Sequence, residues 1–133
     1  MKNHVREIYK CSKCNLAVEI ASACECTEPC MRCCGEVLQP VKVNKVDADK
    51  EKHVPHAVRT ADGINVQIGS VEHPMFEAHH IVWIEIVHGD WTLRKYLNAG
   101  EKPVAEFKLC CNKTEKVKVR AFCNIHGLWE SEV

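Results

Sequence analysis

The segment Ile81-Val-Trp-Ile-Glu-Ile-Val87 is densely apolar, as is typical of a central β-strand, and it decides the expected fold class. The turn-forming sequence His88-Gly-Asp90 follows it, and Trp91-Thr-Leu-Arg-Lys-Tyr-Leu97 then supplies a second strand candidate. No segment of the chain shows an apolar period of 3.6 residues over three helical turns. The sequence therefore predicts an all-β fold.

Apolar and polar residues alternate with a period of two in three further segments, which are residues 64–68, 104–109 and 117–122. Loop-forming residues lie between the strand candidates, as in Asn98-Ala-Gly-Glu-Lys-Pro103. Several short strands at a spacing of about 8–12 residues favour a β-sandwich. We expect this sandwich to occupy residues 39–133, beginning with a polar connection that forms an edge strand and a loop.

Residues 1–38 have a different composition. Seven of the ten cysteines of the chain lie between Cys11 and Cys34, and large apolar residues are few. A segment of this size rarely folds alone unless metal, disulfides or a partner stabilises it. We therefore expect a small N-terminal lobe, residues 1–38, that is held together by metal.

The charge balance and the N-terminus narrow the class of protein. The chain has 18 basic and 18 acidic residues, whereas nucleic-acid-binding proteins usually carry a basic excess. No apolar run approaches the roughly 20 residues that span a bilayer, and Met1-Lys-Asn-His4 does not lead into a signal peptide. We expect a soluble cytoplasmic protein that binds neither nucleic acid nor membranes, in which cysteines serve metal or redox chemistry.

Two cysteine pairs form the first candidate metal site. Cys11 and Cys14 form a C-x-x-C motif, and Cys33 and Cys34 follow after a segment of hairpin size. Four thiolates can converge on one tetrahedral ion, and this donor set suits zinc and iron equally. A purely structural zinc knuckle is one interpretation of the lobe.

Three further cysteines lie in the same lobe, Cys24, Cys26 and Cys30. Seven thiols cannot all bind one ion, so an iron–sulfur cluster that uses some of them is an alternative to a mononuclear site. Reduced thiols without a role are the other alternative. Cys110 and Cys111 have no partner motif, and we interpret them as structural or incidental.

Histidines and one cysteine form the second candidate site. They occur in four segments at expected strand ends or turns, around His53, His73, the pair His79 and His80, and Cys123-Asn-Ile-His126. Neighbouring residues of an extended backbone point to opposite faces, so we expect one histidine of the pair to be a ligand. Four imidazoles and a thiolate would leave one position of an octahedral iron open, which is typical of a site that does chemistry.

These motifs together resemble superoxide reductase in its two-iron form, the desulfoferrodoxin type. The resemblance covers nearly the whole chain and is carried by Tyr9-Lys-Cys-Ser-Lys-Cys14, Cys33-Cys-Gly-Glu36, Glu51-Lys-His-Val-Pro55, Gly69-Ser-Val-Glu-His-Pro-Met75, His79-His-Ile-Val-Trp83 and Cys123-Asn-Ile-His-Gly-Leu-Trp129. It implies an enzyme that reduces superoxide to hydrogen peroxide with electrons from rubredoxin or a similar donor. It also implies an immunoglobulin-like β-sandwich, a desulforedoxin-like N-terminal lobe and a homodimer.

The resemblance assigns two iron sites. The first would be a tetrahedral iron bound by Cys11, Cys14, Cys33 and Cys34. The second would be a catalytic ferrous iron with four equatorial imidazoles and an axial thiolate, from His53, His73, His79, His126 and Cys123. Lys52 would attract the superoxide anion and help to deliver a proton, and Glu51 would occupy the open position once the iron is oxidised.

The chain departs from the family pattern in two places. The segment between Cys14 and Cys33 is longer than usual and contains the three additional cysteines, which leaves mononuclear iron, an iron–sulfur cluster and zinc open for the lobe. His80 replaces a residue that is often aromatic, although the spacing from His73 favours His79 as the ligand. A rubredoxin-like electron-transfer protein with a non-catalytic second site, and a zinc-stabilised binding module, are the competing functions.

Overall fold

The computed structural model describes residues 3–26, 30–45, 53–69, 71–109 and 115–133. Four residues discussed above, Glu51, Lys52, Cys110 and Cys111, lie outside these ranges. The chain divides into two compact units, Met1–Lys42 and Val43–Val133, and each is described by itself.

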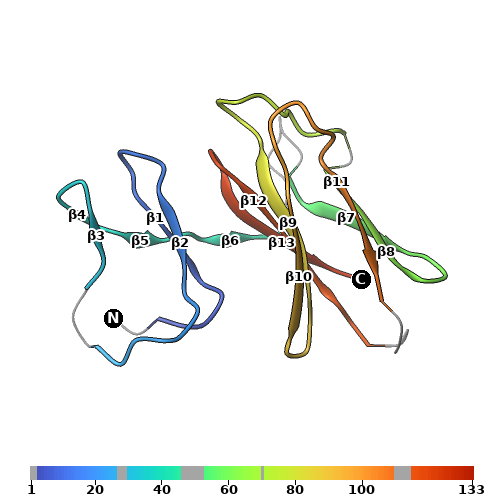
Figure 1. Ribbon diagram of the computed structural model, residues 1–133, viewed down its shortest axis with the longest axis horizontal. Helices are drawn as coiled ribbons and strands as arrows, with labels where there is room; N and C mark the ends of the chain where they lie inside the picture. Colours follow the sequence, from blue (N-terminus) through green and yellow to red (C-terminus); the bar gives the residue numbers. More distant parts are fainter. Residues whose placement is uncertain (1–2, 27–29, 46–52, 70, 110–114) are drawn as a thin grey trace. The chain divides into compact units, whose positions relative to one another are not determined.

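The regular secondary structure of the described residues consists of β-strands, which confirms the predicted all-β class. The strands are β1 (Ile8–Lys10), β2 (Ala17–Glu19), β3 (Arg32–Cys33), β4 (Glu36–Val37), β5 (Gln39–Pro40), β6 (Val43–Asn44), β7 (Pro55–Arg59), β8 (Gly63–Ile68), β9 (Ile81–His88), β10 (Trp91–Tyr96), β11 (Val104–Lys108), β12 (Lys118–Cys123) and β13 (Gly127–Glu132) (Figure 1). Within the described ranges, no helix is long and apolar enough to cross a membrane.

The first unit contains a small antiparallel sheet in the order β2-β1-β5 and a separate β3-β4 hairpin. Its core consists of Tyr9, Cys11, Ile20 and Leu38, which are at most 8% exposed. Such a small core buries little apolar surface. The free energy gained from this burial is small compared with the conformational entropy lost when about forty residues become ordered. The unit therefore needs a stabilising element besides its core.

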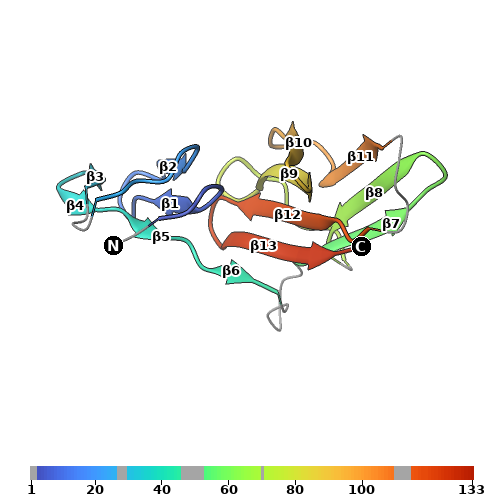
Figure 2. The same cartoon turned by 90° about the horizontal axis from the view of Figure 1, so that it is seen from below.

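The second unit is a β-sandwich (Figure 2). One sheet has the strand order β10-β9-β12-β13-β6, in which only β6 runs parallel to its neighbour, and the other has the order β11-β8-β7. Strand β8 shows why these residues form a sandwich: Ile64, Val66 and Ile68 are buried, whereas Asn65 and Gln67 between them are exposed. Side chains from both sheets form one apolar core between them.

The central strand β9 contains a buried carboxylate. Glu85 is fully buried, and its two oxygens bind the guanidinium groups of Arg94 on β10 and Arg120 on β12. Arg94 also lies over the ring of Trp83, at 4.0 Å from the ring centroid. Because the carboxylate has a cationic partner on each neighbouring strand, an acidic residue is tolerated in this otherwise apolar strand.

Candidate metal centres

Three segments of the sandwich bring the second set of predicted ligands together. His53 lies two residues before β7, His73 and His79 lie in the loop between β8 and β9, and Cys123 and His126 flank the β12–β13 turn. All three segments are strand ends or connections, where side chains from distant parts of the chain can converge on one site.

The β12–β13 hairpin places Cys123 and His126 close together. Cys123 pairs with Gly127 across three loop residues, and Gly127 has a φ of 81°, which a residue without a side chain adopts at low cost. The pairing of β12 with β9 shifts register between Phe122 and Cys123, as in a β-bulge. Bulges re-aim side chains at the ends of strands, and this one lies at the thiol of the candidate site.

The donor atoms of His53, His73, His79 and Cys123 all lie within 4.8 Å of one another. His53 and His73 are only 2% and 3% exposed, and Cys123 is fully buried. His126 lies beside this group, since its Nδ1 is 3.0 Å from Nε2 of His53 and 4.0 Å from Sγ of Cys123. His126 is exposed, so the group faces solvent on this side.

The four imidazole rings form a square. Neighbouring ring centroids are 4.5 Å apart for His53 and His73, 4.9 Å for His73 and His79, 4.9 Å for His79 and His126, and 4.7 Å for His126 and His53. The diagonal from His53 to His79 is longer, at 6.3 Å. Four rings in this order surround a common centre.

Neighbouring groups fix the orientation of individual rings. Nδ1 of His73 donates a hydrogen bond of 2.7 Å to the carbonyl of Pro74, which places the proton on Nδ1 and leaves Nε2 as the ligand atom. His53 stacks on the indole of Trp129, with the centroids 4.6 Å apart and the planes 15° from parallel. These contacts orient the donors before any ion binds.

Asn124 holds the segment that carries His79. Its side-chain carbonyl accepts a 2.9 Å hydrogen bond from the backbone N–H of His80, and its amide donates one of 3.1 Å to the carbonyl of Ala78. The two bonds bracket His79 on both sides along the chain. His80 itself donates from Nδ1 to the carbonyl of Phe76, at 3.0 Å.

The donor set fits a metal ion. Neutral imidazoles and a thiolate suit iron, copper and zinc. With metal–nitrogen bonds of about 2.1 Å, two nitrogens in neighbouring positions lie about 3.0 Å apart, and Nε2 of His53 and Nδ1 of His126 have this separation. The five residues could therefore hold one ion between the square of rings and the thiolate.

The structure thus gathers the five residues that the sequence analysis placed in this site, while Glu51 and Lys52 lie outside the described residues. Asn124 and Trp129 are the supporting residues that the sequence analysis did not single out. Both lie within the motif that contains Cys123 and His126, so their position in that motif was the available signal.

The second group, in the first unit, consists of four cysteines, Cys11, Cys14, Cys33 and Cys34, whose sulfurs lie within 4.8 Å of one another. The Sγ atoms of Cys14 and Cys33 are 3.4 Å apart, and those of Cys33 and Cys34 are 3.8 Å apart. Two sulfurs on a tetrahedral ion with bonds of about 2.3 Å lie about 3.8 Å apart. The group therefore fits a tetrahedral ion.

The backbone turns sharply beside each cysteine pair. Asn15, which follows Cys14, has a φ of 62°, and Cys34 and Gly35 have φ values of 52° and 79°. These left-handed conformations fold each turn back around its sulfurs. Backbone N–H groups then point at the thiols, as when Lys13 donates to Sγ of Cys11 at 3.4 Å.

The thiols of this group influence one another's protonation. Hydrogen bonds from the backbone N–H groups of Lys13 and Cys14 lower the pKa of Cys11 to about 7. The hydrogen bond with Cys14 raises the pKa of Cys33 to about 12, because it favours the protonated thiol. Close thiols resist simultaneous ionisation, and a cation that binds them offsets this repulsion by displacing the protons.

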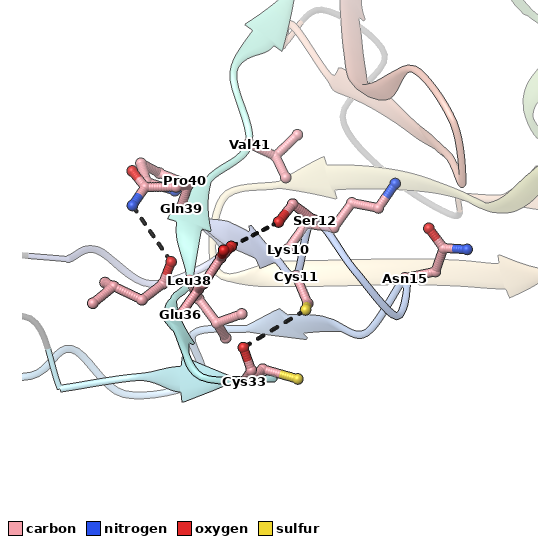
Figure 3. A pocket seen from close by; sticks show the side chains of 11 residues that line it. Lys10, Cys11, Ser12, Asn15, Cys33, Glu36, Leu38, Gln39, Pro40 and Val41 are labelled. Atoms are coloured by element: carbon pink, nitrogen blue, oxygen red, sulfur yellow. Dashed lines mark hydrogen bonds between the residues drawn. The ribbon is translucent and has the colours of Figure 1, made fainter.

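A hollow of about 530 Å³ lies beside Cys11 and Cys33 in the first unit (Figure 3). Strand β5 and the segments around it line one side through Leu38, Gln39 and Pro40. The Ser12 hydroxyl donates a 3.1 Å hydrogen bond to the carboxylate of Glu36 across the hollow's rim (Figure 3). This bond links the two cysteine-bearing turns.

Comparisons with known proteins find one matching family model and several similar chains. The family model described as desulfoferrodoxin matches residues 45–132. Desulfoferrodoxin from Syntrophotalea carbinolica is 46% identical, and the alignment covers 95% of each chain; desulfoferrodoxin from Nitratidesulfovibrio vulgaris is 44% identical, again over 95% of each. The crystal structure of the superoxide reductase from Treponema pallidum superposes with a TM-score of 0.71 at 26% identity, covering 94% of this chain and 96% of the other.

Proposed function

The chain belongs to the desulfoferrodoxin family of superoxide reductases, and we propose that it reduces superoxide to hydrogen peroxide at a non-haem ferrous ion bound by His53, His73, His79, His126 and Cys123. The observation that carries the proposal is the square of four imidazole rings with a buried thiolate beside it. This arrangement would supply five ligands and would leave one position for a small anion.

The reaction adds one electron and two protons to superoxide and yields one molecule of hydrogen peroxide. A ferrous ion at this site supplies the electron when it is bound. The Cys123 thiolate donates electron density toward the site, as thiolates do in some haem enzymes, and so favours electron release. Because Cys123 is fully buried, water does not weaken this effect by solvating the sulfur.

Lys52 and Glu51 support the chemistry in this proposal. Lys52 directly precedes the ligand His53, and its positive charge would attract the superoxide anion toward the exposed side of the site. It would also pass a proton through water to the reduced product. Glu51 would bind at the open position after oxidation. Both roles rest on the resemblance to the family and on sequence position.

The first unit would hold a second iron through Cys11, Cys14, Cys33 and Cys34. A tetrahedral site of four thiolates suits one-electron exchange, because the ligands remain the same in both oxidation states. We propose rubredoxin or a similar protein as the electron donor. By the same resemblance, the protein would act in the cytoplasm and would form a homodimer. Light scattering on the purified protein tests the dimer.

An anaerobic superoxide pulse tests the enzymatic proposal. The protein is purified without oxygen, its metals are counted, and the reduced form receives a pulse of superoxide while its spectrum is followed. We expect rapid oxidation of the histidine- and cysteine-bound iron, with peroxide formed and no dioxygen released. Slow or absent oxidation of the iron-loaded protein would contradict the proposal.

Two cysteine variants separate the enzyme from an electron-transfer protein, the function that the four-cysteine group alone would favour. Cys123→Ala should remove the thiolate-to-iron absorption band and the rapid reaction with superoxide. Cys14→Ser removes a ligand of the other group and should leave that reaction intact. If Cys123→Ala reacts with superoxide as fast as the wild type, the histidine site does not carry the reaction, and electron transfer at the first unit becomes the favoured function.

A further inference from the structure

Three cysteines of the first unit form a cluster that neither iron site uses. The sulfurs of Cys24, Cys26 and Cys30 lie within 4.8 Å of one another, and those of Cys24 and Cys30 are 3.9 Å apart. Cys24 is half-buried, and the other two thiols are exposed. The cluster therefore combines three sulfur donors with an opening to solvent.

The structure holds Cys24 in place from two directions. Asn3 is 5% exposed, and its side-chain carbonyl accepts a 2.7 Å hydrogen bond from the backbone N–H of Cys24. The backbone N–H of Cys26 donates to the sulfur of Cys24 at 3.1 Å. A hydrogen bond from N–H to sulfur stabilises the thiolate, which is the form that binds metals. The side-chain hydrogen bond with Cys26, and after it this backbone bond, lower the pKa of Cys24.

The geometry favours a bound ion over a disulfide. A disulfide joins two sulfurs at about 2.0 Å and would leave the third cysteine of the cluster unused. The 3.9 Å between the sulfurs of Cys24 and Cys30 is instead the separation of two ligands on one ion: metal–sulfur bonds of about 2.3 Å at angles near 120° place the sulfurs about 4.0 Å apart.

The number of ligands indicates the kind of ion. Among the described residues, no fourth cysteine, histidine or carboxylate joins the cluster. Structural zinc sites and cubane or two-iron clusters take four protein ligands as a rule. Soft thiolates select Cu(I), a cation that three sulfurs can coordinate without a fourth ligand. We propose that Cys24, Cys26 and Cys30 form a third metal site, which binds Cu(I) through three thiolates.

Copper titration of the full-length, iron-loaded protein tests this site. Cu(I) is supplied anaerobically from a chelator buffer, and bound copper and iron are both counted after desalting. We expect the wild-type protein to bind one Cu(I) per chain with its iron retained, and X-ray absorption to report sulfur-only, three-coordinate copper. Cys26→Ser, which changes an exposed thiol, should lose this copper and keep both iron spectra.

Cys110→Ser serves as the matched control, because it also removes one thiol but lies far from the cluster in the sequence, and it should bind copper as the wild type does. Any of four results would overturn the proposal. Two concern copper: Cys26→Ser binds as much copper as the wild type, or copper is taken up only as iron is lost. The other two concern the cluster itself: it holds four-coordinate zinc that Cu(I) does not displace, or two of its cysteines form a disulfide in the anaerobically purified protein. Because iron content and the superoxide reaction are measured separately, failure here leaves the enzymatic proposal standing.

Discussion

Replacing Asn124 by alanine should weaken iron binding at the histidine site without touching a proposed ligand. The substitution removes two hydrogen bonds, the one accepted from the N–H of His80 at 2.9 Å and the one donated to the carbonyl of Ala78 at 3.1 Å. These bonds fix the backbone on both sides of His79. The backbone bond from the N–H of Asn124 to the carbonyl of His80 remains in the variant.

The size of the effect follows from the two lost bonds. Each is worth about 0.5–1.5 kcal/mol, so the restraint on His79 weakens by about 1–3 kcal/mol. Ala78 is exposed, and water can replace the partner of its carbonyl, which places the cost toward the lower end. Since 1.4 kcal/mol is a factor of ten, iron affinity should fall about 10-fold, the lower end of the range for residues that orient metal ligands.

Competition against an iron chelator measures this affinity, and the thiolate-to-iron band reports the occupied site. Asn98→Ala is the matched control, because it removes a 2.9 Å hydrogen bond from an exposed asparagine to Glu101 within a turn. It should leave iron affinity unchanged. The reasoning is refuted if the Asn124→Ala variant binds iron as tightly as the wild type and the Asn98→Ala control. In that case, the two Asn124 hydrogen bonds on either side of His79 do not position a ligand.

Three further substitutions test the packing and the first unit. Glu85→Gln should lower the free energy of unfolding by about 3 kcal/mol in denaturant titrations, because buried Arg120 loses its counter-charge; an unchanged midpoint would contradict this. Gly63→Ala should cost about 1–3 kcal/mol by the same measurement, since its Cβ would lie 1.8 Å from the carbonyl oxygen of Phe107. Cys14→Ser should remove the metal of the four-cysteine group, and metal counting should find the histidine site still loaded.

The sandwich strands could be predicted because their burial follows a local period. Alternation over residues 64–68 reappears as β8 (Gly63–Ile68), with one additional residue at its start. Strand β7 (Pro55–Arg59) was not predicted: it begins with a proline, which usually marks an edge or a loop, and the pairing with β8 that makes it a strand lies outside the segment. The two-residue strands of the first unit are too short to carry any period.

The candidate sites show a similar division. Ligand types and spacing pointed to His53, His73 and Cys123 because metal chemistry restricts which residues can serve. The position of Asn124 in the motif could draw attention to it, but its hydrogen bonds could not be predicted, since they reach a backbone segment more than forty residues earlier in the chain. The square of rings likewise exists only once the three segments have folded together.

The two units must depend on their metals in different ways. The sandwich has a continuous core in which residues such as Ile68, Ile84 and Val119 are fully buried, and its histidine site lies at the ends of strands that this core already holds. Metal binding there should add function to an existing fold. Among the described residues of the first unit, the buried cluster contains only four side chains, so we expect the free energy of metal binding to its thiols to be a large part of its folding free energy. Metal binding by Cys11, Cys14, Cys33 and Cys34 should therefore stabilise this unit where burial cannot.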